Sequence, residues 1–254
     1  MGRSFETTDW TLVRTARARD SRQGEAALAR LCQAYWFPLY AFVRHQGYSA
    51  DDAADLVQGF FATLLEKHYL EDVDPAAGRF RTFLLTSLKH FLANERAKER
   101  ALKRGGGAPQ LSLDARLSLD SREAERRWVY EPVGEETPED VYERRWARTV
   151  VDRAMARLRS ERAAVGKAAE FEELSPYLTG EEPHPVYSEI AARLGASQAT
   201  LRVAVHRLRT QFGDLLRHEI RQTVARRDQV DDEVRHLLEI LGANDRKGDR
   251  LRGA

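Results

Sequence analysis

The stretch YSEIAARLGASQATLRVAVHRLR, residues 187–209, decides how the second half of this chain folds. Ile190 and Leu194 are apolar at i and i+4, as on one helix face, and Gly195 follows where that helix needs a left-handed residue to end. Ser197 is placed to cap a second helix. Two helices joined by such a turn form a helix-turn-helix, which presents its second helix to the major groove of DNA. We therefore expect this segment to read DNA.

The second helix carries side chains suited to base edges and phosphates. An arginine can form two hydrogen bonds with guanine, and a glutamine can do so with adenine. Arg209 fits a phosphate contact, which positions the protein without reading sequence. Any single arginine could equally lie on a solvated helix face. The candidate DNA contacts are Gln198, Thr200, Arg202, Val203, His206, Arg207 and Arg209.

Charge is sorted along the chain, although the net charge is only +1. Residues 79–104 hold eight basic side chains against two acids, and residues 197–227 hold seven arginines against two acids. Residues 47–78 hold seven acids against one lysine. This sorting favours two surfaces that face a polyanion and one acidic surface, while the alternative is ordinary solvated helix faces.

Length and composition set broad limits. A chain of 254 residues can form one large or two modest domains. Cys32 is the single cysteine, so no internal disulfide can form, and its apolar neighbours predict a buried core thiol. The sequence shows no signal-peptide pattern and no apolar run long enough to cross a bilayer. We expect a soluble, cytoplasmic protein that does not contact a membrane.

Helical periodicity dominates and predicts an all-α protein of two small helical domains joined by a flexible linker. One helix is expected at about residues 24–46, where Pro38 should kink or split it and Gly47 should end it. A second helix should begin at Ser49 as its N-cap, and a third should span about residues 79–104. The predicted domains are residues 1–104, a linker at 105–141, and 142–254 with the helix-turn-helix at 187–209 and a C-terminal helical extension.

This order of acidic helix, basic helix and helix-turn-helix resembles a bacterial RNA polymerase sigma factor of the extracytoplasmic-function (ECF) type. Asp55-Leu56-Val57-Gln58-Gly59-Phe60-Phe61 resembles the acidic-Leu-Val-Gln-x-x-Phe string of the family's core-binding helix. Gly78-Arg79-Phe80-Arg81-Thr82-Phe83-Leu84 resembles the start of the helix that melts and reads the −10 promoter element. Residues 187–209 resemble the module that reads the −35 element. The resemblance covers about residues 25–104 and 142–217.

The resemblance implies a sigma factor that directs polymerase core to specific promoters for transcription initiation. Its partners would be RNA polymerase core, through the clamp helices of the largest subunit and the flap, and promoter DNA; it also allows an anti-sigma factor or another regulator. The implied polymerase-binding residues are Asp52, Asp55, Leu56, Gln58 and Phe61. The implied −10 contacts, basic and polar side chains beside aromatics, are Arg79, Arg81, Lys89, His90, Asn94, Arg96 and Lys98.

Catalysis and the binding of cofactors or metals are not expected. The seven histidines are scattered, no pair has metal-binding spacing around a glutamate, and residues 105–107 lack the Lys-Ser/Thr of a phosphate loop. Two alternatives stay open: a helix-turn-helix regulator that pairs through residues 230–241, and an adaptor that binds polymerase or an anti-sigma partner without initiating. The acidic helix at residues 51–61 favours a polymerase-binding protein, since a simple repressor has no need of it. Residues 160–186 have no predicted role.

Overall fold

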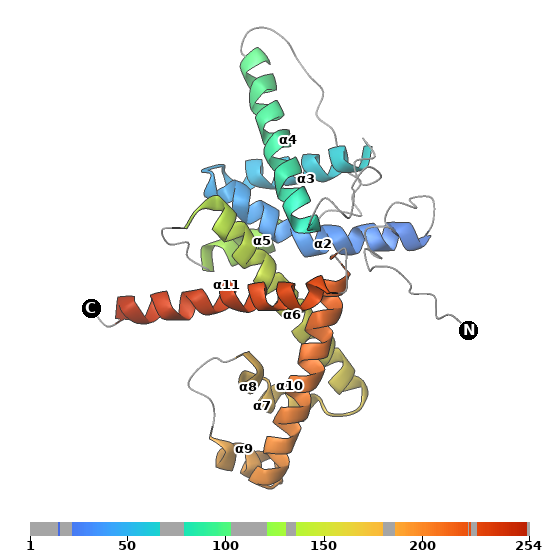
Figure 1. Cartoon of the computed structure of the whole chain (residues 1–254), viewed down its shortest axis with the longest axis vertical. Coiled ribbons are helices and arrows are strands. Elements are labelled where there is room, and N and C mark those ends of the chain that lie inside the picture. The colour runs from blue at the N-terminus through green and yellow to red at the C-terminus, as the bar shows by residue number, and fades with distance from the viewer. Residues whose placement is uncertain are drawn as a thin grey trace. The chain divides into compact units, whose positions relative to one another are not determined.

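The computed structural model of this chain is all-α, as the periodicity predicts (Figure 1). It describes residues 15, 22–66, 79–102, 121–130, 136–179, 186–222, 224 and 228–252, and no strand occurs within these ranges. No helix in them is long and apolar enough to cross a membrane. The helices are α2 (Arg22–His45), α3 (Ala50–Glu66), α4 (Phe80–Leu102), α5 (Ser121–Tyr130), α6 (Pro138–Ala164), α7 (Ala168–Leu174), α8 (Pro176–Thr179), α9 (Tyr187–Leu194), α10 (Gln198–Arg221) and α11 (Gln229–Arg252).

The chain divides into two compact units whose boundaries differ from those of the predicted domains. The first unit contains residues 1–149 and 221–254, and the second contains residues 150–220. The predicted linker holds α5 and the start of α6, which belong to the first unit. The C-terminal extension also belongs to the first unit, because α11 buries Leu237 and pairs Glu233 with Arg79 and Arg81. Helical periodicity does not predict such long-range contacts.

In the first unit, α2, α3 and α4 pack on one another. α2 is continuous although it contains Pro38, so the predicted split does not occur. Gly47 follows the end of α2 with a left-handed φ of 89°, and its N–H donates to the carbonyl of Arg44 at 3.0 Å, which confirms the predicted stop. Cys32 is buried as predicted, and burial raises the pKa of its thiol to about 12.

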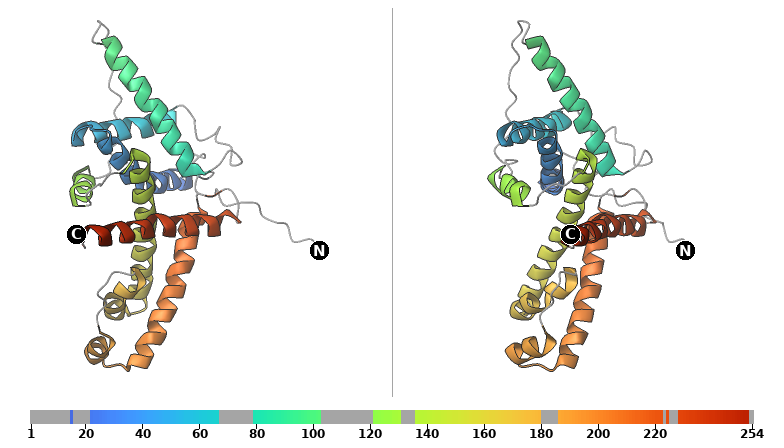
Figure 2. Two further views of the ribbon diagram at one scale, coloured as in Figure 1. Left: turned by 60° about the vertical axis from the view of Figure 1, so that its left-hand side comes forward. Right: turned by 90° about the vertical axis from the view of Figure 1, so that its left-hand side faces the viewer.

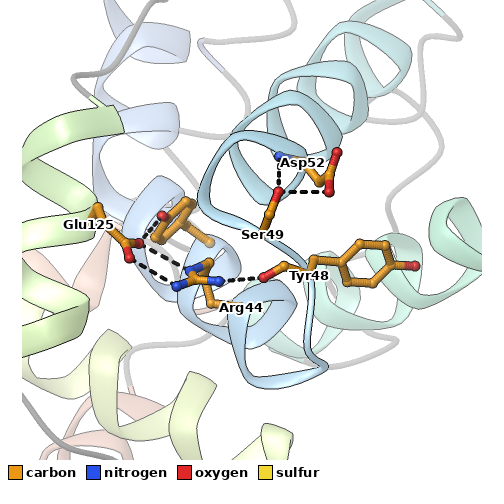
Figure 3. Close-up of polar contacts among 6 residues, drawn as sticks. Arg44, Tyr48, Ser49, Asp52 and Glu125 are labelled. Carbon is orange, nitrogen blue, oxygen red and sulfur yellow. Dashed lines mark hydrogen bonds and ion pairs between the residues drawn. The ribbon is translucent and has the colours of Figure 1, made fainter.

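The start of α3 and the end of α4 also follow the sequence. The Ser49 hydroxyl accepts the N–H of Asp52 at 3.1 Å and donates to the Asp52 carboxylate at 2.7 Å, so Ser49 is the N-cap of α3 (Figure 3). The later turns of α4 extend beyond α2 and α3 in every view (Figures 1 and 2). Leu92 is the last buried side chain described in α4, so the apolar stripe of this helix ends there while the helix continues to Leu102.

The core of the second unit consists of buried side chains from the end of α6, from α7, α8 and α9, and from a long apolar stripe of α10. Phe171 of α7 and Ile190 of α9 are fully buried in this core. An ion pair between Arg153 Nε and Glu219 Oε2 at 3.1 Å joins α6 to α10. The opposite face of α10 is exposed. The buried side chains of α10 are Leu201, Val205, Leu208, Leu215, Leu216 and Ile220.

Candidate nucleic-acid and partner interfaces

The junction between α9 and α10 is built by local backbone chemistry. Gly195 is left-handed, with φ 61° and ψ 32°, and its N–H donates to the carbonyl of Ala191, which ends α9. The N–H of Thr200 donates to Ser197 Oγ at 3.1 Å, which caps α10. The predicted glycine stop and serine cap are both confirmed. The three-residue connection 195–197 therefore fixes where the exposed face of α10 begins.

The predicted DNA contacts of α10 are all exposed, but they have different surroundings. The Arg202 guanidinium lies 5.6 Å from the centre of the Tyr187 ring, and Tyr187 in turn stacks on Tyr177 at 4.6 Å. The Arg209 guanidinium binds the chain itself, because its Nε and Nη2 donate to the Tyr177 carbonyl at 3.2 and 3.0 Å. Arg209 therefore supports α8 in this structure. Gln198 and His206 stay on the exposed face.

Three of the predicted residues, Thr200, Val203 and Arg207, line a hollow of about 640 Å³ in the second unit. Val203 is 50% exposed there, which is unusual for a large apolar side chain. The far wall carries Arg162 and Lys167, so three cations line the hollow with Glu170 as the acid. The complete lining is Arg162, Lys167, Glu170, Ala199, Thr200, Val203, Ala204, Arg207, Leu208 and Gln211.

The residues of the far wall were not predicted from the sequence. Arg162 Nη2 pairs with Glu170 Oε1 at 2.8 Å, and Lys167 Nζ lies 3.9 Å from the same oxygen. They come from residues 160–186, to which the sequence assigned no role. Their polar, charged composition resembles any exposed helix end, so only the fold brings them beside Arg207.

The two acidic residues of α3 that are predicted to bind polymerase, Asp52 and Asp55, have different surroundings. Asp52 is occupied by the Ser49 cap (Figure 3), whereas Asp55 is exposed and makes no hydrogen bond or ion pair with the described residues. Leu56 and Gln58 are half-buried beside it. Phe61 lies in the core, 3% exposed and stacked on Trp36 at 6.3 Å, so it supports the helix and is not on this surface.

The predicted −10 contacts along α4 point in several directions. Lys89 pairs with Glu139 at 2.6 Å, and this hydrogen bond and charge lower the pKa of the Glu139 carboxyl. Arg96 donates to Tyr48 Oη at 2.8 Å and to Gln46 Oε1 at 2.6 Å. Three other predicted −10 contacts lie at i, i+4 and i+8 on one exposed stripe of α4, which consists of His90, Asn94 and Lys98.

Arg79 and Arg81 do not lie on that stripe. Arg81 is 4% exposed; its Nε lies 2.8 Å from Glu143 Oε2, and its Nη1 pairs with Glu233. Arg79 also pairs with Glu233 through its Nε. The two arginines that the sequence places among the DNA contacts are therefore held by carboxylates of the chain itself.

Helix α5 packs on α2 and α3, and its Glu125 binds two side chains of α2. Tyr40 Oη donates to Glu125 Oε2. Arg44 donates to the same carboxylate through Nε at 3.1 Å and Nη2 at 2.9 Å (Figure 3). Trp128 lies beside them, with the Arg44 guanidinium 5.7 Å from its ring centre. Burial tends to raise the pKa of Glu125, but the hydrogen bonds from Tyr40 and Arg44 outweigh it and lower the pKa.

Acidification is expected to release α5. The lowered pKa of Glu125 means that its stabilising contribution is complete above the ordinary value of 4.5 and is lost as the pH falls through the folded value. Hydrogen–deuterium exchange of residues 121–130, corrected for intrinsic rates, should show protection that is kept above pH 4.5 and is lost as the pH falls below this value. Glu125→Gln should remove this pH dependence, whereas Glu123→Gln on the exposed side should keep it. Equal pH profiles for all three proteins would contradict the assignment.

Comparison with protein-family models, with curated proteins and with solved structures finds no match for this chain. Within the described residues, no group of three or more His, Cys, Asp or Glu side chains is placed to hold a metal ion.

Proposed function

We propose that this chain is a sigma-type initiation factor that joins RNA polymerase core to specific promoters. The observation that carries the proposal is the helix pair α9–α10, with a left-handed glycine, a serine cap and an exposed second helix. Arg202 and His206 on that face and Arg207 at the hollow are suited to major-groove readout as a helix-turn-helix. The cationic hollow beside them suits the sugar-phosphate backbone.

The first unit would bind polymerase through α3 and the −10 element through α4. The exposed Asp55 beside Leu56 and Gln58 gives α3 an acidic patch with an apolar rim, which suits docking on a basic coiled coil such as the polymerase clamp helices. The exposed stripe His90, Asn94 and Lys98 on α4 would follow a single DNA strand at the −10 element. In this proposal the two units grip a promoter at two elements while polymerase holds the first unit.

The test is run-off transcription with bacterial polymerase core on a randomised promoter library. The chain should yield discrete, promoter-specific transcripts that core alone does not yield. Arg202→Ala and Arg207→Ala should each weaken promoter use by about 1–3 kcal/mol and relax the preference in the upstream element. Arg157→Ala, which removes an exposed arginine of the same unit from α6, should leave promoter choice unchanged. Specific duplex binding without any association with core would instead favour a regulator that acts without polymerase.

A further inference from the structure

A buried ion cluster ties α11 to the residues at the start of α4. The Glu233 side chain is 2% exposed and pairs with both Arg79 and Arg81. Arg81 lies between Glu233 and Glu143, and its guanidinium is 4.3 Å from the centre of the Trp146 ring. A buried carboxylate is tolerated in such a place only because its charge is compensated.

Removal of α11 would change the net charge of this ion cluster at the start of α4. With α11 docked, the guanidiniums of Arg79 and Arg81 face the carboxylates of Glu143 and Glu233, so the charges balance. Without Glu233, the two guanidiniums face Glu143 alone, beside the ring of Trp146. We name Arg79, Arg81 and Trp146 the arginine socket. Cations beside an aromatic face are what single-stranded nucleic acid binds.

The buried face of α11 is narrow where its side chains are described, at residues 229–242. The buried side chains there are Val230, Glu233 and Leu237, which share one face at i, i+3 and i+7, and His236 Nε2 lies 3.4 Å from Glu143 Oε2 beside them. The side chains at Asp231, Asp232 and Leu238 are exposed. A helix held by one narrow stripe with an ion cluster at its centre can open locally without unfolding the unit.

We propose that α11 is an internal acidic mimic: Glu233 occupies the arginine socket in place of a phosphate of single-stranded DNA, and release of α11 opens the socket. The same guanidinium fork binds a carboxylate or a phosphate, so one can replace the other. This inference rests on the proposed function, because it assigns a regulatory contact to the start of the proposed −10 helix. The docked chain is the closed state for single-strand binding.

The test compares Glu233→Gln with Glu239→Gln in the full chain. Both substitutions remove one negative charge from α11, but Glu239 is exposed. Hydrogen–deuterium exchange should show lost protection of residues 229–241 in Glu233→Gln alone. Fluorescence anisotropy with a labelled single-stranded oligonucleotide should show at least about fivefold tighter binding in the same variant. Because loss of the Glu233 charge would leave the socket one cation in excess, for one phosphate, the slope of log K against log salt should steepen by roughly 0.7, and the added substitution Arg79→Gln should reverse most of that change.

Two results would overturn the proposal. One is release of α11 in Glu233→Gln with the affinity and salt slope of Glu239→Gln; the other is full protection of α11 in Glu233→Gln. If Glu233→Gln does not fold, Leu237→Ala decides, because it removes a buried apolar contact of α11 and keeps the Glu233 carboxylate. Failure of the proposed function is separate: the wild-type chain would then not bind polymerase core or duplex promoter DNA, whatever α11 does.

Discussion

Reversal of the Asp55 charge is expected to abolish the binding of RNA polymerase core by this chain. Asp55 is an exposed carboxylate of α3 that makes no hydrogen bond or ion pair with the described residues, whereas the carboxylate of Asp52 accepts a hydrogen bond from the Ser49 cap. In the proposed complex, Asp55→Arg would place a cation against a basic coiled coil. Like charges across an interface cost several kcal/mol, which corresponds to about 100-fold or more in affinity. Because the side chain is exposed, the fold of the first unit should not change.

The measurement is biolayer interferometry with immobilised core, together with circular dichroism of each variant. Asp214→Arg is the matched control, since it makes the same charge reversal at an exposed position of α10 in the other unit. It should retain wild-type affinity for isolated core. Undiminished core binding by Asp55→Arg would remove Asp55 from the interface and weaken the proposed sigma-type function.

Features that depend on a few neighbouring residues are predictable from this sequence. Gly47 and Gly195 adopt the left-handed conformations that end helices, and the side chains of Ser49 and Ser197 cap the helices that follow. Each of these positions follows from the conformational freedom of glycine or the short reach of a serine hydroxyl. The effect of Pro38 does not follow from local chemistry alone. Proline favours a kink or a break, but α2 stays continuous around it within a buried segment, where tertiary packing supports the helix.

Features that depend on distant residues were not predictable. Basic residues at 79–104 look alike in the sequence, yet Arg81 is buried because Glu143, 62 residues later, and Glu233 are brought to it. Arg209 looks like a DNA contact, but the carbonyl of Tyr177 holds its guanidinium. Phe61 belongs to a string that resembles a polymerase-binding motif, yet it packs on Trp36. Helical periodicity indicates which face is apolar and does not indicate which element covers it.

Loss of the Arg81 charge is expected to destabilise the first unit strongly. Arg81→Leu would leave Glu143 without this ion pair and the nearly inaccessible Glu233 with Arg79 as its remaining partner in the cluster. Removing one partner from a buried ion pair typically costs about 3–5 kcal/mol, because the charge left behind is uncompensated. The substitution also removes the contact with the Trp146 ring. Urea denaturation followed by tryptophan fluorescence and circular dichroism should show a transition shifted to lower urea.

Arg96→Leu provides the matched control, because it makes the same substitution later in the same helix. Arg96 is exposed, and its hydrogen bonds to Tyr48 and Gln46 lie at the surface, so its loss should cost no more than about 1 kcal/mol. A difference of this size would establish Arg81 as a structural residue. If both variants unfold at the urea concentration of the wild type, the buried cluster does not hold α4, α6 and α11 together.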